Sequence, residues 1–157
     1  MSHENSSRHE LIARGVIIQD GAILVNRGRN AKTGVEYFAL PGGHIDPGES
    51  SRTAVERELE EELNAKVSVG ELVFVSESIY PGRHEDDGRR QEIVLYFAAT
   101  LQSELHEENG IIASPEADKR FCWLPMSDVP ASNVLPRTVK EFLVKPEVPL
   151  YGFSDDT

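Results

Sequence analysis

The segment 50–63 has the pattern of an amphipathic helix and lies between runs of strand-forming residues. At about 100° per residue, Val55, Leu59 and Leu63 fall on one stripe, which predicts a buried helix face. Ser50 comes just before the helix, and its hydroxyl can accept a hydrogen bond from a free amide of the first turn. The chain must therefore pack this helix against strands.

Strand-forming runs dominate the rest of the sequence. They cover residues 11–18, 22–27, 35–40, 66–80, 91–101 and 120–125, with a hairpin turn at 19–21. A second helix is expected from Pro136 to about Val144. Two helices among strands indicate a mixed α/β architecture built in layers.

The 157 residues contain no repeat and no linker, which predicts a single domain. We expect this domain to span residues 10–145. A flexible N-terminal tail is expected over 1–9 and a C-terminal tail over 146–157.

The formal net charge of −11 argues against binding to a DNA or RNA duplex, which requires a basic surface. A small phosphorylated ligand is compatible with this charge if a metal ion or local arginines offset the repulsion. Cys122 is the single cysteine, so no intramolecular disulfide can form. The sequence has no membrane-length apolar run and no signal peptide, and we expect a cytoplasmic protein.

Carboxylates crowd the predicted helix. Glu58, Glu61 and Glu62 fall within an arc of about 100° beside the apolar stripe, so they form like-charged pairs that destabilise an isolated helix. A solvated acidic face is the simpler interpretation. The location beside the apolar stripe and after a glycine-rich turn favours a site for a hard divalent cation, for which Mg²⁺ is the natural choice.

The segment from Gly43 to Ala65 resembles the Nudix box. The matching positions are Gly43, Glu49, Arg57, Glu58, Leu59, Glu61 and Glu62. Two positions depart from the pattern, because Asn64 stands where the family usually has glycine and Ala65 replaces a larger aliphatic residue. Asparagine tolerates the left-handed conformation that closes a helix, so we expect the turn to survive.

The resemblance implies a Nudix-type α/β/α sandwich with a mixed β-sheet between helices. It also implies a hydrolase that uses Mg²⁺ or Mn²⁺ to cleave the diphosphate linkage of a nucleoside diphosphate derivative. Glu58, Glu61 and Glu62 would then be metal ligands together with the carbonyl of Gly42, with Glu58 and Glu61 also counted as catalytic. Glu49, Arg57 and Gly43 would support the site.

Outside this segment, the resemblance suggests Glu116 as a general base or an additional ligand, with Glu104, Glu107 and Glu108 as competitors. Substrate contacts are expected from Arg27, Tyr80 and Asn133. The alternatives for Arg27 and Asn133 are an ordinary strand-end arginine and a turn residue before Pro136.

Three substrate classes stay open on the sequence: ADP-ribose-like compounds, dinucleoside polyphosphates and (d)NTPs. A proline at position 81 resembles the subgroup that acts on ADP-ribose, and Tyr80 resembles the subgroup that acts on dinucleoside polyphosphates. Arg27 and Asn133 lie in segments that resemble the branch acting on (d)NTPs. The alternative to an enzyme is a catalytically weak Nudix-like domain that binds a nucleotide as a sensor. Many relatives are dimers, so a homodimer is compatible with the resemblance.

Overall fold

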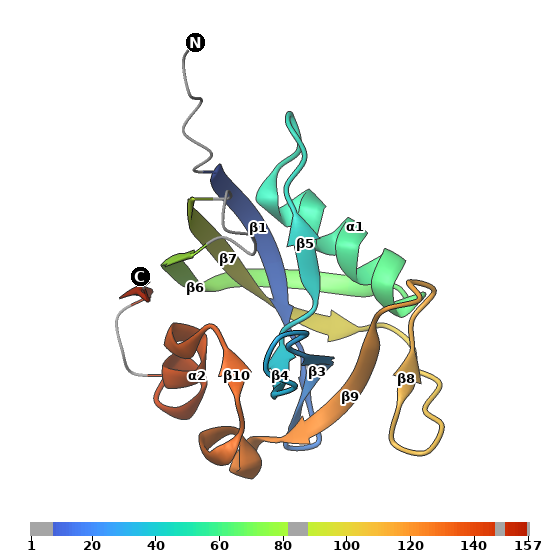
Figure 1. The fold of residues 1–157 in the computed structure, drawn as a ribbon. Helices are drawn as coiled ribbons and strands as arrows, with labels where there is room; N and C mark the ends of the chain where they lie inside the picture. The colour runs from blue at the N-terminus through green and yellow to red at the C-terminus, as the bar shows by residue number, and fades with distance from the viewer. Residues whose placement is uncertain (1–7, 82–87, 147–149, 157) are drawn as a thin grey trace.

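The structure is a computed structural model that describes residues 8–81, 88–146 and 150–156. Most strands belong to two sheets (Figure 1). The first has the order β11-β6-β7-β1-β5 and is mixed, because β1 pairs in parallel with β7 and antiparallel with β5. Its strands are β1 (Arg8–Val16), β5 (Gly42–His44), β6 (Val67–Pro81), β7 (Arg89–Leu101) and β11 (Tyr151–Asp155).

The second sheet has the order β10-β4-β3-β9-β8, with the short β2 paired to β3. Its strands are β2 (Ile18–Gln19), β3 (Ala22–Arg29), β4 (Glu36–Ala39), β8 (Ile112–Ala113), β9 (Arg120–Pro125) and β10 (Val134–Leu135). A 3₁₀ helix, η2 (Met126–Ala131), links β9 to β10. The turn at Asp20 and Gly21 between β2 and β3 is the predicted hairpin, and both residues have positive φ.

Two helices cover opposite faces of the first sheet, as Figure 1 shows. Helix α1 (Ser51–Leu63) packs on one side through Val55, Leu59 and Leu63, and α2 (Arg137–Val144) packs on the other. The alternation along β7 supplies both cores. Val94 and Tyr96 join the cluster under α2, whereas Phe97 joins the cluster under α1.

The predicted α/β/α sandwich with a mixed sheet between helices is therefore confirmed, since the first sheet is mixed and lies between α1 and α2. The remaining strands form the second hydrogen-bonded sheet. Bulges in β6 between Val69 and Phe74 shift its register against β7.

Two predicted tails need correction. The segment predicted as a tail over 146–157 contains the strand β11. Its residues pair in parallel with Val75–Ile79 of β6 and form the edge of the first sheet. At the other end, β1 begins at Arg8 and so extends into the predicted tail 1–9, of which residues 1–7 lie outside the described part of the chain. No helix in the described residues has the length and apolar character needed to cross a membrane.

Candidate active site

The ends of α1 are closed by the residues that the sequence indicated. Ser50 is the N-cap, and its hydroxyl accepts a hydrogen bond from the amide of Thr53 at 3.1 Å. Asn64 ends the helix in the left-handed conformation, with φ 50° and ψ 42°. The departure from glycine at this position is therefore accommodated, because asparagine adopts this conformation more readily than most residues.

A two-pronged ion pair fixes the loop before α1 to the helix. Arg57 Nε donates to Glu49 Oε2 at 2.8 Å, and Nη2 donates to Glu49 Oε1 at 2.9 Å. Glu49 also accepts from the amide of Asp46 at 3.1 Å. The hydrogen bonds from Arg57, together with that amide, lower the pKa of Glu49 to about 2. The contact predicted between Glu49 and Arg57 is present.

Arg57 also reaches the carboxylates of α1 itself. Its Nη1 lies 2.9 Å from Glu58 Oε1 and 3.4 Å from Glu61 Oε2. The Glu58 carboxylate lies directly over Gly43, where an added Cβ would be 2.5 Å from its Oε2. Gly43 thus leaves free the space that the Glu58 carboxylate occupies, and its supporting role at the site stays a prediction.

Glu62 is a wholly buried carboxylate with both oxygens engaged. Oε2 accepts from the amide of Gly42 at 3.1 Å, and Oε1 accepts from the ammonium of Lys119. Burial raises the pKa of Glu62, although both of these hydrogen bonds act in the opposite direction. Burial lowers the pKa of Lys119, but the hydrogen bonds and charges of Glu62 and Glu116 together outweigh it, so the pKa of Lys119 is raised.

Three carboxylates from two separate segments come together here. Oxygens of Glu58, Glu62 and Glu116 all lie within 4.8 Å of one another. Glu116 belongs to the turn before β9, where the amide of Lys119 donates to its carbonyl oxygen at 3.1 Å. Of the four loop glutamates weighed on the sequence, Glu116 is the one in this group.

Glu61 lies outside the group of three. Its side chain is 53% exposed and shares an open hollow on the outer face of α1 with Glu56 and Glu60. The predicted arc of three carboxylates is therefore split in this structure, with Glu62 directed inward and Glu61 outward. The metal and catalytic roles of Glu61 stay predictions.

Arg27 and Asn133 are joined through one residue of β4. Arg27 Nε donates to Glu36 Oε2 at 2.8 Å, and Asn133 Nδ2 donates to the carbonyl of Glu36 at 3.0 Å. Arg27 and Glu36 line an open hollow of about 530 Å³ together with Asp118 and Arg120. The loop that carries Glu116 therefore borders this hollow as well, because Asp118 belongs to it.

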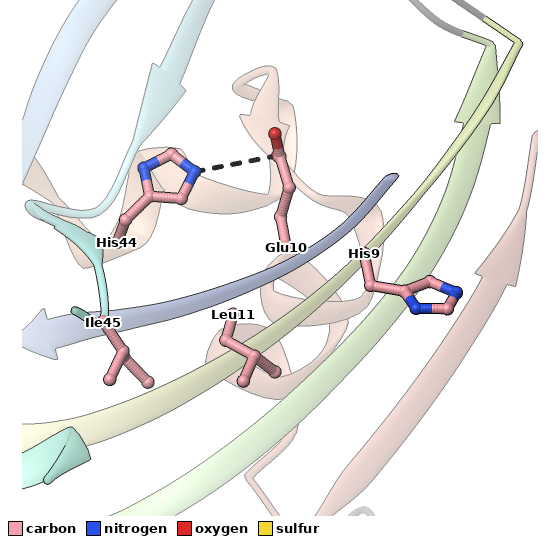
Figure 2. Close-up of a pocket in the computed structure, with 5 residues that line it drawn as sticks. All are labelled: His9, Glu10, Leu11, His44 and Ile45. Carbon is pink, nitrogen blue, oxygen red and sulfur yellow. Dashed lines mark ion pairs between the residues drawn. The ribbon is translucent and has the colours of Figure 1, made fainter. Parts of the chain in front are cut away.

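Tyr80 lies in a different network, near the beginning of β1. Its neighbours there are Glu92, with which it shares a hydrogen bond, and the charges of Glu10 and Arg90. Glu10 pairs with Arg90 at 3.0 Å. It also lies 3.9 Å from His44 Nε2, and Figure 2 draws this second pair. Within the described residues, Tyr80 belongs neither to the group of three carboxylates nor to the residues that line the hollow beside Arg27.

The model of the NUDIX domain matches residues 9–143. The chain belongs to the NUDIX family. The CTP pyrophosphohydrolase of Escherichia coli (strain K12) is 32% identical over 129 residues, which cover 76% of this chain and 85% of that protein.

Solved structures of Nudix proteins have the same fold. A MutT NUDIX hydrolase from Burkholderia pseudomallei superimposes with a TM-score of 0.66 at 23% identity, covering 88% of this chain and 99% of its own. A MutT protein from Bacillus halodurans gives a TM-score of 0.69 at 18% identity, covering 94% and 90% of the two chains. The predicted Nudix fold and the predicted enzyme class, a Nudix hydrolase, are confirmed.

The donor set of this Nudix chain fits a divalent cation. Glu58, Glu62 and Glu116 offer carboxylate oxygens only, which suits Mg²⁺ or Mn²⁺. The ammonium of Lys119 already lies between Glu62 and Glu116, 3.3 Å from the latter, so the site holds a positive group. Nudix enzymes generally use divalent metals, and these residues can hold one.

Sequence reasoning missed two residues of the site, Lys119 and Glu36. Lys119 stands three positions after Glu116, which is the spacing of an i,i+3 pair on a turn. That spacing was the available signal for it. Nothing in the sequence near Glu36 indicated its contacts. The contact with Arg27 arises because β3 pairs with β4, and the contact with Asn133 arises because β10 pairs with β4.

Replacing Gly43 by alanine is expected to weaken Mn²⁺ binding by about tenfold or more, because the new methyl group would displace the Glu58 carboxylate. Since the close atoms belong to a side chain, the fold should persist. Isothermal titration with Mn²⁺ measures the affinity, and circular dichroism checks the fold. Wild-type affinity in Gly43→Ala would contradict a metal-binding role for Glu58.

Proposed function

We propose that this Nudix hydrolase is a Mg²⁺- or Mn²⁺-dependent pyrophosphohydrolase that converts a nucleoside triphosphate to a nucleoside monophosphate and pyrophosphate. The observation that carries the proposal is the group of Glu58, Glu62 and Glu116, with Glu62 wholly buried. A buried carboxylate in an all-oxygen group favours a cation site over a solvated acidic surface.

The chain's own residues would divide the work as follows. Glu58, Glu62, Glu116 and the Gly42 carbonyl would hold the metal, and Glu61 keeps its predicted role as a further ligand. When bound, the divalent ion supplies charge neutralisation on the diphosphate oxygens and makes phosphorus more susceptible to attack.

Proton transfer is assigned to a carboxylate at the edge of the group. Glu116 is 39% exposed, so it can reach both a water molecule and the group. In the reaction, water oxygen bonds to one phosphorus while the bond from that phosphorus to the bridging oxygen breaks. The water proton passes to the carboxylate, and the bridging oxygen leaves with the second product.

A nucleoside triphosphate is favoured over the other two substrate classes by where the substrate candidates lie. Arg27 and Asn133, which suggested this class, meet at Glu36 beside the hollow next to the Glu116 loop. Tyr80, which suggested dinucleoside polyphosphates, belongs to the network around Glu10. The E. coli relative is named for a nucleoside triphosphate, which supports the same choice.

A substrate comparison tests the proposal. CTP, the other (d)NTPs, ADP-ribose and diadenosine polyphosphates are each incubated with Mg²⁺, and products are separated by ion-exchange chromatography. We expect a (d)NTP to give monophosphate and pyrophosphate at the highest kcat/KM, and EDTA to abolish turnover. Faster hydrolysis of ADP-ribose would contradict the substrate class. If the protein binds one of these compounds but hydrolyses none of them, the result would favour the alternative of a nucleotide-binding sensor domain.

A further inference from the structure

We propose that the ammonium of Lys119 is a built-in counterion of the carboxylate group, and that it must leave Glu62 when a divalent ion binds. Lys119 would thereby lower the metal affinity of the site. This inference rests on the proposed function, because it assumes that the carboxylates bind a metal.

The contacts of Lys119 place its charge where a metal ligand would be used. Its Nζ bonds to Glu62 Oε1 and lies 3.3 Å from Glu116 Oε2. The other Glu62 oxygen already accepts from the Gly42 amide. A cation that takes Glu62 as a ligand therefore meets one oxygen facing a backbone donor and one facing Lys119.

Of these two partners, Lys119 is the one that can move. The Gly42 amide belongs to β5, which is paired to β1 through Arg14, Ala13 and Ile12. Lys119 is held by a turn, its side chain is 26% exposed, and its four-carbon stem can turn toward solvent. Departure of the ammonium leaves Oε1 available without any change in the strands.

The balance of charge sets the direction of the effect. Glu58, Glu62 and Glu116 are paired with Lys119 and with Arg57, and Arg57 is shared with Glu49, so the three carboxylates outnumber the cations beside them. A divalent ion entering the group is repelled by an ammonium that stays, or must compete with it for Glu62. Both consequences weaken metal binding, and removal of the charge on Lys119 should strengthen it.

Mn²⁺ binding to the substrate-free protein tests this directly, with free Mn²⁺ measured by electron paramagnetic resonance. Lys119→Met removes the charge. Lys119→Gln also removes the charge but keeps a hydrogen-bond donor for Glu62, and it serves as the test variant if Lys119→Met fails to fold. Lys119→Arg keeps the charge. Lys145→Met is the matched control, because Lys145 is an exposed residue at the end of α2 and its loss changes the net charge equally.

We expect Lys119→Met and Lys119→Gln to bind Mn²⁺ at least about tenfold more tightly than wild type, and the other two variants to bind within about twofold of it. Without metal, Lys119→Met should also melt at a lower temperature than wild type, and saturating Mn²⁺ should close the gap. If both neutral variants bind Mn²⁺ no more tightly than wild type, the inference about Lys119 is overturned while the proposed metal dependence stands. Failure of wild type and all variants to bind Mn²⁺ overturns the proposed metal dependence as well.

Discussion

Glutamine in place of Glu62 is expected to lower kcat/KM for Mg²⁺-dependent nucleotide hydrolysis by about 10³-fold, which corresponds to about 4 kcal/mol of transition-state stabilisation. The neutral amide keeps one acceptor for the Gly42 amide but turns its NH₂ group toward Lys119. Donor then faces donor, and a buried negative charge that a cation needs is lost. Steady-state kinetics with CTP at saturating Mg²⁺ measures the effect.

Glu56→Gln is the matched control, since Glu56 is exposed on the outer face of the same helix, about 120° around the axis from Glu62. It removes the same charge and should retain activity within about twofold of wild type. Circular dichroism and a thermal melt of Glu62→Gln separate a lost site from a lost fold. A folded Glu62→Gln enzyme with activity near that of the Glu56→Gln control would exclude Glu62 from the metal site.

Helix α1 was predictable from the sequence because its determinants are local. The N-cap at Ser50, the apolar stripe and the closing residue Asn64 all act within one or two turns. The pairing of Arg57 with Glu49 follows from the same short range, since the helix begins two residues after Glu49. The helix and the contact that holds its preceding loop can therefore be predicted without knowing how the sheets are formed.

The different environments of Glu61 and Glu62 were not predictable in this way. At about 100° per residue, Glu62 lies about 20° from Val55 and Glu61 about 120° from it, so helical geometry places Glu62 next to the apolar stripe but does not say whether another segment covers it. The loop that carries Glu116 and Lys119 covers one and leaves the other open. Burial of Glu62 thus depends on a segment more than fifty residues away.

Short strands escaped sequence analysis for a related reason. Gly42–His44 has little strand propensity and forms β5 because β1 offers it a partner. Tyr151–Asp155 forms β11 because the edge of β6 is free to pair with it in parallel. Strand pairing at long range decided both cases, whereas composition favoured a turn and a tail.

Leu59→Ala is expected to lower the free energy of unfolding by about 3 kcal/mol. Leu59 is wholly buried. Its side chain packs against β1 at Gly15, where an added Cβ would lie 2.7 Å from Leu59 Cδ1. Truncation leaves a cavity that the strand cannot fill, because Gly15 has no side chain to offer. Urea denaturation followed by circular dichroism measures the change.

The control is Leu72→Ala, which truncates the same residue type at an exposed position of β6. It should cost less than about 1 kcal/mol. Because Leu59 presses the carboxylate helix onto the sheet, Leu59→Ala should also weaken Mn²⁺ binding, while Leu72→Ala should leave it unchanged. Equal losses of stability in the two variants would show that the contact of α1 with Gly15 does not hold the helix in place.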